Sequence, residues 1–547
     1  MKKTYTTTEA IDYLTEPTDS EPESDGSVTE SASDDDVEFQ LTSDSNSSSD
    51  STQSEELDDT QETADPMWTS KNGLHWSPTN AKTLRYVPAK VLRPGPTHYA
   101  TARIVDPRSA FQLLFTEEMV KLIVDRTNLQ GRRSETDWIN VDATEVEAYL
   151  GVLILAGVYK SRNESTQWDD HTGRPIFRAT MPHRNLQKFI SNVRFDDRLT
   201  RPGHYRDDKL AAFRPIWDKW LYRLPLLFNP GVDVCVDEQL VGFRGRCIFR
   251  QYIPSKPAKY GIKIWVTSDV STSYAWKMQI YAGKSAGCAP EVKQGQRVVR
   301  DMTDGLEGHT VTTDNFFTSY ALAEELLKKK KELPPHLLQT RARAPRSSEF
   351  AFRKTTTAVS YVPKRGKNLL LLSTKHREPA VSGEEHQKPV MIMDYNRCKG
   401  AVDSLDKGVG AYSCKRKTSR WPMTLFYNLI DVSAINAFVL RVAVDPSWNQ
   451  EKTFKRRLFL EELGRMLVYP QMKRRERLPC TPAAAAMVQS QQRAENSEAS
   501  GSADTHGKRR RGCSFCTNKR RKISTTCSKC GIYICKEHAL QFCSSCK

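Results

Sequence analysis

The sequence predicts an α/β core of the ribonuclease-H-like type at residues 232–412, with mainly helical segments on both sides of it. Residues 232–237 alternate valine with polar residues, and Tyr260–Asp269 and Tyr274–Gly283 are β-rich runs joined by a Ser-Thr-Ser turn. A helix around Val292–Met302, a strand in "GHTVTTDNFF" and a leucine-bearing helix follow. Three strands, a helix, a fourth strand and another helix is the ribonuclease-H-like order, in which strand four lies parallel beside strand one.

The first and fourth strands each carry an aspartate where we expect the two strands to meet. "VDVCVDEQLVGFRGR" (232–246) places its valines on one face of a strand and Asp233, Cys235 and Asp237 on the other. We expect Asp237 to end strand one and Asp314, in "TTDNFFTS", to end strand four, which would make them neighbours. In "NRCKGAVDSLDKG" Asp403 and Asp406 are three residues apart and share a helix face.

Carboxylates aimed at one point predict a divalent-metal site. Two hard cations about 3.5–4 Å apart, as in nucleases and polymerases, need several such ligands. One cation lowers the pKa of the attacking water or 3′-hydroxyl, and the other stabilises the leaving oxygen. A single aspartate is more often a surface strand end, and an Asp pair on a helix is usually a solvated face. Four carboxylates in these topological positions favour the metal site.

Basic residues flank the four aspartates. They suit phosphate contacts, although charge runs are usually solvated faces. Trp421 could stack on an unpaired base, or it could be a core residue at a helix start. The candidate DNA-binding residues are Arg244, Arg246, Arg250, Lys256, Lys259, Lys263, Lys415, Arg416, Lys417, Arg420 and Trp421.

Charge divides the chain unevenly. Residues 1–66 hold 20 acidic and 2 basic residues, a net of −18, while the whole chain carries +16, so the remainder carries +34. An acidic head poor in aromatic residues predicts disorder over residues 1–100. A basic body predicts a polyanionic partner, most commonly nucleic acid. No secretory signal or membrane-spanning run is expected, because the apolar stretch at 425–440 is interrupted by Asn428, Asp431 and Asn436.

Helical patterns occupy both flanks of the core. Within 101–231, Thr116 is the expected cap of one helix, and Thr144 with Glu147 forms the expected capping box of another. Residues 413–479 are expected to be helical, and 480–507 read as a low-complexity linker. An insertion at about 332–386 is mixed and loop-rich. Extended runs are expected in "NLLLLST" and, just after it, in "KPVMIMDY".

The last residues, 508–547, predict a zinc-binding module. Eight ligands in four pairs are the right number for two tetrahedral Zn²⁺ sites, and a segment this short would draw its folding energy from the metal. The spacing favours interleaved pairs, with a sequential pairing as the alternative. One interleaved site is Cys513, Cys516, Cys535 and His538, and the other is Cys527, Cys530, Cys543 and Cys546. The adjacent basic runs 508–511 and 519–522 suit phosphate contact or nuclear import.

Several of these motifs together resemble piggyBac-family DNA transposases. The resemblance rests on "DEQLVGFRGRC…YIPSKPAKYGIK", "TDNFFTS", "YNRCKGAVDSLDK" and "KRKTSRWP" and extends from about residue 100 to the C-terminus. It implies a catalytic triad of Asp237, Asp314 and Asp403, with Asp406 as a further ligand of Mg²⁺ or Mn²⁺. It also implies strand cleavage, hairpin formation and joining at TTAA targets in double-stranded DNA. By the same resemblance the helical parts bind transposon ends and form a homodimer, the zinc module recognises DNA, and the protein is nuclear.

One stretch departs from the family pattern. After Lys331 the chain runs directly into "ELPPHLLQT", where family members place a β-strand that would pair with strand four. A sheet without that strand could lose its catalytic geometry, so a non-catalytic DNA-binding or chromatin protein derived from a transposase is the alternative. A zinc protein of the ubiquitin-ligase type is a third possibility, suggested by the interleaved ligands alone.

Overall fold

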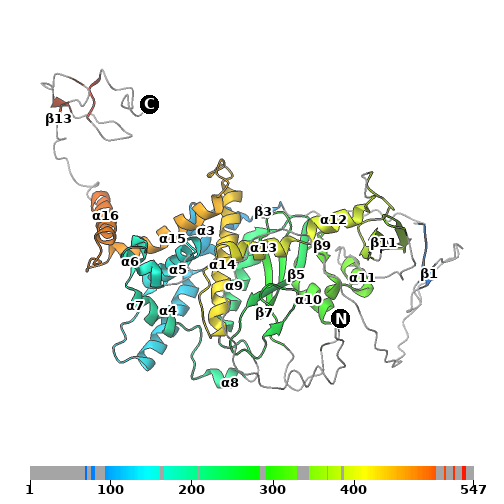
Figure 1. Cartoon of the computed structure of the whole chain (residues 1–547), viewed down its shortest axis with the longest axis horizontal. Coiled ribbons are helices and arrows are strands. Elements are labelled where there is room, and N and C mark those ends of the chain that lie inside the picture. The colour runs from blue at the N-terminus through cyan, green and yellow to red at the C-terminus, as the bar shows by residue number, and fades with distance from the viewer. Residues whose placement is uncertain are drawn as a thin grey trace. The chain divides into compact units, whose positions relative to one another are not determined.

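A computed structural model describes most of the chain from residue 93 onwards (Figure 1). The described ranges are 93–160, 165–205, 208–283, 291, 293–328, 344–365, 367–383 and 387–499, with short pieces at 68–69, 75–79, 511–512, 516, 522–523 and 533–536. The expected acidic disordered region lies almost entirely outside these residues. So does the segment after Lys331 where a strand was expected to be missing.

The core is a five-stranded sheet in the order β6-β7-β5-β9, with β8 paired to β7. Strand β5 runs antiparallel to β7 and parallel to β9, which confirms the expected ribonuclease-H-like strand order. Helix α10 precedes β9 and helix α11 follows it, also as expected. The bounds are β5 Asp233–Gly242, β6 Gln251–Tyr252, β7 Tyr260–Asp269, β8 Ala275–Ile280, α10 Gln294–Met302, β9 Thr310–Thr313 and α11 Tyr320–Lys328.

The prediction that Asp237 ends its strand is wrong. Strand β5 continues to Gly242 because its pairing with β7 continues to Gly242↔Gly261. Asp314, by contrast, follows directly on β9 and caps the short 3-10 helix η2 (Asn315–Phe317), as a strand-end residue should.

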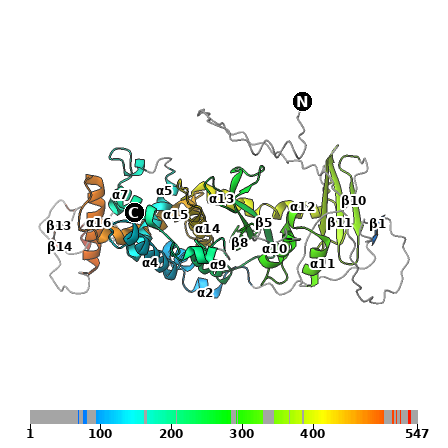
Figure 2. The same cartoon turned by 90° about the horizontal axis from the view of Figure 1, so that it is seen from below.

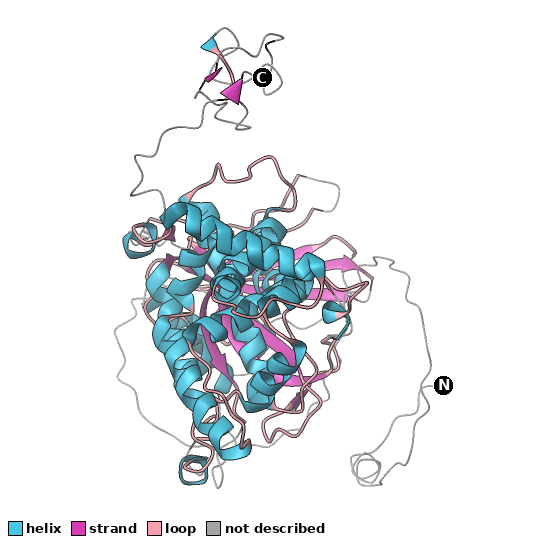
Figure 3. Ribbon diagram, turned by 90° about the vertical axis from the view of Figure 1, so that its left-hand side faces the viewer, coloured by secondary structure: helices cyan, strands magenta, loops and turns pink. Residues whose placement is uncertain are grey.

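Helices cover both faces of the sheet, and Figure 3 shows them around the strands. The hydroxyl of Thr267 on β7 donates to the Met302 carbonyl of α10, so α10 lies on one face. Helix α13 (Ala401–Ala411) packs on β5 and β7 from the other face, with α14 (Trp421–Val444) beside it. Because both faces are covered, β5 is buried on each side, as Val236 and Cys235 show with 0% and 2% exposure.

The helical flanks pack against each other. Helix α15 lies along α5, and α14 lies along α3. The α5–α15 contact depends on two glycines, because a Cβ on Gly151 would lie 2.8 Å from the Gly464 carbonyl oxygen. The remaining helical bounds are η1 Ser165–Trp168, α2 His98–Thr101, α3 Pro107–Leu114, α4 Glu117–Ser134, α5 Ala143–Val158, α6 Pro175–Thr180, α7 His183–Asn192, α8 Arg201–Tyr205, α9 Arg214–Leu227 and α15 Lys455–Lys473. Short strands β3 Gly95–Pro96 and β4 Phe228–Asn229 pair with each other beside these helices. Strands β1 Trp68–Thr69 and β2 His75–Trp76 form a separate pair, and Ser77 after β2 bridges to Phe352.

The helix caps differ in part from expectation. Thr116 does occupy the N-cap position of α4, but its side chain makes no capping hydrogen bond. The capping box of α5 is Asp142 with Glu145, so the predicted pair Thr144 and Glu147 is wrong. Glu147 is instead held by Arg108 at 2.6 Å, on the side where α3 packs.

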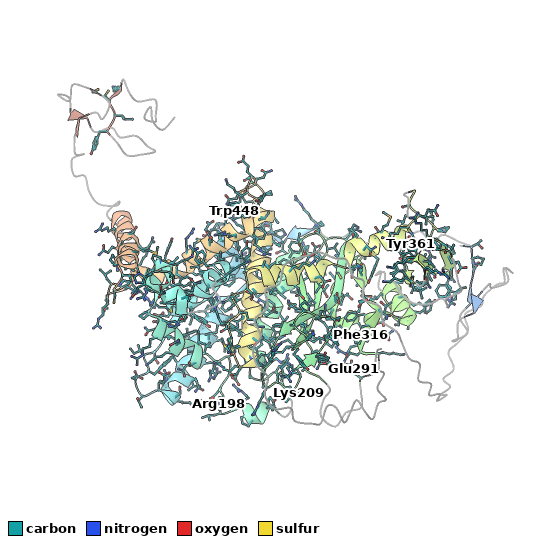
Figure 4. All side chains as sticks on the ribbon, viewed as in Figure 1. Arg198, Lys209, Glu291, Phe316, Tyr361 and Trp448 are labelled. Carbon is teal, nitrogen blue, oxygen red and sulfur yellow. The ribbon has the colours of Figure 1, made fainter. Side chains whose placement is uncertain are left out.

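The insertion forms its own antiparallel sheet, β10 (Ser348–Phe352), β11 (Thr357–Lys364) and β12 (Lys367–Ser373), and β12 confirms the extended run at "NLLLLST". Figure 2 shows this sheet beyond α12, and Tyr361, labelled in Figure 4, is buried in it. The second extended prediction, "KPVMIMDY", is wrong. It begins helix α12 (Val390–Cys398), because Met391 and Ile392 pack on the apolar face of the small sheet.

The predicted linker at 480–507 is also largely helical. Residues Pro482–Ala499 form α16, whose Ala484 and Val488 are buried at helical spacing. The Gln492 amide donates to the carbonyls of Lys473 and Arg475, which fixes α16 to the end of α15. Helix α14 is long and apolar enough to cross a membrane, but 83% of its most apolar window is buried inside the fold.

Candidate active site

The parallel pairing of β5 with β9 brings two of the predicted aspartates together. Val236 pairs with Thr313, and Asp237 and Asp314 are the next residue of each chain segment. Their charges interact, since Asp314 raises the pKa of Asp237. The Oδ1 atom of Asp314 accepts the Asn315 amide at 2.7 Å, which orients that carboxylate at the strand end.

Helix α13 supplies the other two carboxylates from above the same face of the sheet (Figure 1). Asp403 lies in the first turn of α13, and its side chain is 59% exposed. Asp406 is one turn further on and accepts a hydrogen bond from Gln239 of β5 at 2.6 Å. All four predicted site aspartates therefore lie on the parts of β5, β9 and α13 that face one another.

Lys256 lies among these carboxylates. Its ammonium is 3.8 Å from Asp403 Oδ1 and donates to the Glu238 carbonyl oxygen at 3.1 Å. Burial alone would lower the pKa of Lys256, but the charges of Asp237, Glu238, Asp403 and Asp406 together raise it. Lys256 therefore interacts electrostatically with both carboxylates of α13 and both of β5.

Asp237 and Asp406 are the half-buried acids of the cluster, whereas Asp314 and Asp403 are exposed. Burial raises the pKa of Asp237 to about 7, the charges of Glu238 and Asp314 add to this rise, and Lys256 opposes it. Burial likewise raises the pKa of Asp406 to about 6, against the hydrogen bond from Gln239. Because the pKa values of Asp237 and Asp406 lie close to neutral pH, a bound cation would stabilise the site by favouring the ionised carboxylates.

The donor set fits a hard divalent cation. All four side chains offer carboxylate oxygens, which are the ligands of Mg²⁺ and Mn²⁺. Among the described residues, no three His, Cys, Asp or Glu side chains are yet placed closely enough to hold one ion. Asp314 and Asp403 are exposed, so their side chains have room to adjust.

Sequence reasoning missed two residues of the site, Gln239 and Asn428. The Gln239 amide donates to Asp406, and its carbonyl oxygen accepts from the Asn428 amide of α14 at 2.9 Å. Both side chains are buried, at 3% and 5% exposure. The available signals were the position of Gln239 two residues after Asp237, which puts both on one strand face, and a lone Asn in an apolar helix.

The predicted DNA-binding residues divide into exposed and half-buried side chains. Exposed ones are Arg244, Arg246, Arg250, Lys259, Lys415 and Lys417, whereas Lys256, Lys263, Arg416, Arg420 and Trp421 are half-buried. Lys263 lies 3.6 Å from Glu238 and 4.8 Å from the ring of the half-exposed Phe316, labelled in Figure 4. These two residues lie on the α10 side of the sheet, opposite Asp237.

Arg420 and Trp421 have roles inside the fold. The Arg420 guanidinium donates to the Ile190 carbonyl oxygen at 2.9 Å and to that of Val193, so it holds the end of α7. Trp421 begins α14 and packs edge-to-face on Phe249, with ring centroids 5.1 Å apart. This is the helix-start core position that the sequence left as one of two interpretations.

Of the eight predicted zinc ligands, Cys516 and Cys535 are described. Their Sγ atoms are 3.6 Å apart. Strands β13 (Arg511–Gly512) and β14 (Lys522–Ile523) pair antiparallel; Cys516 lies between them in sequence and Cys535 follows β14. The other six ligands are outside the described residues.

A ribonuclease-H-like sheet with aspartates on its two parallel neighbours suits enzymes that cleave and join nucleic acid strands. Residues 106–438 match a family model described as Transposase IS4. The chain therefore belongs to this transposase family, on its piggyBac branch.

Known proteins of this branch are similar over most of the chain. The human PiggyBac transposable element-derived protein 3 is 23% identical over 416 residues, which are 70% of this chain and 69% of the relative. The human PiggyBac transposable element-derived protein 5 is 21% identical over 403 residues, 65% of this chain and 74% of the relative. The cryo-EM structure of a piggyBac transposase in a synaptic complex with hairpin DNA matches with a TM-score of 0.68 and 32% identity, covering 83% of this chain and 100% of the solved one.

Proposed function

We propose that this chain is a DNA transposase that cleaves transposon ends and joins them at TTAA targets, with Asp237, Asp314 and Asp403 as its catalytic residues. The observation that carries this proposal is the parallel pairing of β5 with β9, which makes Asp237 and Asp314 neighbours beneath α13. The TTAA target comes from the resemblance of the sequence motifs to the piggyBac family. Hairpin DNA in the solved relative supports a double-stranded DNA substrate.

Asp406 joins the triad as a fourth ligand for Mg²⁺ or Mn²⁺. When bound, two such cations activate the attacking oxygen and stabilise the leaving one. Asp237 and Asp406, whose protonated forms burial favours, would hold the metal through their ionised oxygens. The Lys256 ammonium, 3.8 Å from Asp403 Oδ1, would contact a phosphate oxygen of the DNA at this site.

The exposed cations next to the site are proposed to hold the DNA backbone. Arg244 and Arg246 lie in the turn after β5, and Lys417 lies just before α14. We propose that the two helical flanks bind the transposon ends and form the homodimer, and that the protein acts in the nucleus.

The C-terminal module is proposed to bind two Zn²⁺ and to contact DNA. Zn–S bonds of about 2.3 Å in a tetrahedron place two sulfurs about 3.8 Å apart. The 3.6 Å between the sulfurs of Cys516 and Cys535 agrees with ligands of one ion. That pair belongs to a single site in the interleaved arrangement and to two sites in the sequential one, so it supports the interleaved arrangement.

The test is cleavage in vitro. Purified protein with Mg²⁺ should nick duplex DNA at the junction of a transposon end with TTAA. Asp237→Asn should reduce the rate by about a thousandfold or more, because it removes a ligand of the reacting centre. Asp304→Asn, at a turn outside the cluster, should leave the rate unchanged. Cleavage that survives in Asp237→Asn and in Asp314→Asn would contradict the proposal.

A further inference from the structure

The C-cap residues of helices α5 and α13, Tyr159 and Tyr412, both hold cations on their rings. The Arg174 guanidinium lies 3.9 Å from the centre of the Tyr159 ring. The Arg456 guanidinium and the Lys160 ammonium lie 4.9 Å and 5.7 Å from the centre of the Tyr412 ring. We call these three cations and two rings the cation platform.

The cations of the platform have no acidic partner, by ion pair or hydrogen bond, among the residues that the structure describes. By contrast Arg457, the residue after Arg456, pairs with Glu461 at 3.0 Å. Burial lowers the pKa of Arg456, and among its neighbours only Tyr412 opposes this shift. Positive charge that the fold leaves uncompensated in this way suits a polyanion.

Helix α13 separates the platform from the catalytic acids, and Figures 1 and 2 both show α13 between strand β5 and helix α5. A Cβ on Gly408 of α13 would lie 3.1 Å from an Arg456 guanidinium nitrogen, so Arg456 lies against this helix. At 3.6 residues per turn, Gly408 and Asp406 lie on nearly opposite sides of α13. The exposed residues Ser404 and Lys407 occupy the arc between them. An α-helix is about 10 Å across, so a DNA strand that crosses this arc spans about two nucleotides.

The platform also joins α13 to the helical part of the chain. A Cβ on Gly157 of α5 would clash with the Tyr412 carbonyl oxygen, so the ends of α5 and α13 are in contact. Arg174 is the N-cap residue of α6. The cations therefore continue the surface beside the active site away from the catalytic sheet and towards α5 and α6.

We propose that the cation platform binds backbone phosphates of the transposon-end strand, about two to four nucleotides from the bond that is cut. This inference rests on the proposed function and extends it, because it assigns the path of the DNA from the catalytic acids to the helical flank. The rings restrict the cationic side chains before DNA arrives, so less side-chain freedom is lost on binding. The alternative role for these cations is purely structural, since the helix dipole favours a cation near a helix C-terminus.

Lys160 offers a test that separates the two roles. Its φ is 49°, in the left-handed region that favours glycine after a helix C-terminus. Lys160→Gly therefore removes a charge and suits the backbone. We expect an unchanged or higher melting temperature, whereas the dissociation constant for DNA should rise by about threefold or more. A lower melting temperature with unchanged DNA affinity would mean that Lys160 serves the helix end alone, and would contradict the inference.

The whole platform is tested by the salt dependence of DNA binding, measured by fluorescence anisotropy. The probe is a labelled duplex that carries a transposon end joined to TTAA, with Ca²⁺ in place of Mg²⁺ so that the strand stays intact. Lys160→Gln, Arg174→Gln and Arg456→Gln combined should make the slope of log affinity against log salt shallower by about 2.7, because about 0.9 is lost for each phosphate contact. A matched control removes three exposed cations of the insertion sheet and should leave the slope unchanged: Lys354→Gln, Lys364→Gln and Arg365→Gln.

Uncharged methylphosphonate groups, placed singly in the DNA, then locate the phosphates. In the transposon-end strand they should weaken binding by wild type at two or three adjacent positions, and the triple platform variant should be insensitive at those positions.

Two results would overturn the inference while the proposed function stands. If wild type cleaves the duplex but the triple platform variant keeps the wild-type slope, the platform does not bind DNA. If the positions at which the two proteins differ lie on the TTAA side of the cut, the platform holds the flanking DNA and the assigned path is wrong. If wild type neither binds nor cleaves the duplex, the proposed function itself fails and the inference fails with it.

Discussion

Gln239 is the residue through which the core holds Asp406. Its buried amide group is bonded at both ends, to the Asp406 carboxylate and to the Asn428 amide. A carboxylate oxygen fixed in this way offers its remaining lone pairs in a constant direction, which is how residues behind a metal site tune its affinity. Asn428 in turn fixes which end of the Gln239 amide faces Asp406.

Removing this support should weaken metal binding. Gln239→Leu keeps the volume of the side chain but leaves Asp406 without its donor. We expect the dissociation constant for Mn²⁺, measured from the electron paramagnetic resonance signal of free Mn²⁺, to rise by about 10–100-fold. Asn428→Leu should act in the same direction, and Gln279→Leu on β8 should have no effect. Unchanged Mn²⁺ affinity in both Gln239→Leu and Asn428→Leu would mean that other contacts hold Asp406.

The sequence could predict the acids of this site but not the amides that support them. Four aspartates stood out because carboxylates at strand ends and on one helix face have a chemical meaning. Gln239 and Asn428 act through contacts between residues 167 and 189 positions apart. Nothing in either local pattern encodes such a contact. The sequence left the role of Trp421 undecided for the same reason, because only the fold shows that Phe249 lies beside it.

Helix α14 carries a buried acid that binds it to the preceding loop. Asp431 accepts hydrogen bonds from the Ser413 hydroxyl at 2.7 Å and the Cys414 amide at 2.9 Å. Burial nevertheless raises its pKa to about 6. Between about pH 4 and pH 6, the folded protein therefore keeps a proton on Asp431 that the unfolded chain, with a pKa near 3.8, has released.

The sign of this shift predicts how stability depends on pH. Because the folded-state pKa is the higher one, Asp431 costs stability as pH rises from about 4 to about 6, and the full cost is present above that window. Asp431→Asn keeps an acceptor for the Cys414 amide and removes the ionisation. In EDTA, its melting temperature relative to wild type should be higher at pH 8 than at pH 4, equivalent to at most about 3 kcal/mol.

Asp445 at the end of α14 provides the opposite control. The Ser447 hydrogen bond lowers its pKa, and Arg441 adds to this. Asp445→Asn should therefore lose relative stability as pH rises. A constant difference between Asp431→Asn and wild type from pH 4 to pH 8 would show that Asp431 is ionised in the folded protein throughout.

Helices and strands were predicted correctly where the local sequence pattern determines them. The predictions failed where packing against another part of the fold determines the structure. The hairpin of β7 and β8 and the parallel strand β9 followed from alternation and turn residues. "KPVMIMDY" became α12 because its apolar residues pack on the insertion sheet, which the sequence did not reveal. The low-complexity composition of 480–507 led to the prediction of a linker, but the alanine-rich run at 482–486 is a strong helix former. Helix α16 also packs on α15 and α6, which stabilises it.

At the scale of the whole molecule, the zinc module can be tested through metal counting. With interleaved ligands, Cys516 and Cys535 serve the same ion, so the double variant Cys516→Ser with Cys535→Ser should lose one of two Zn²⁺. Sequential ligands would place the two cysteines on different ions, and both Zn²⁺ would be lost. Zinc measured by native mass spectrometry decides between them, and Cys480→Ser, an exposed cysteine outside the module, should retain both.

The contacts of helix α14 determine where segments of this protein can be exchanged with those of a related protein. Helix α14 touches α7 through Arg420, the active site through Asn428, α9 through the bond of Ser433 to Trp220, and β8 through Asn436. A single continuous helix thus carries a contact to each part of the core at a different turn. Anyone who builds chimaeras of related transposases should treat α14 as indivisible. Exchanging the helical flank or the catalytic sheet alone breaks one set of contacts, whereas moving α14 together with α7, α9 and β5–β9 keeps all of them.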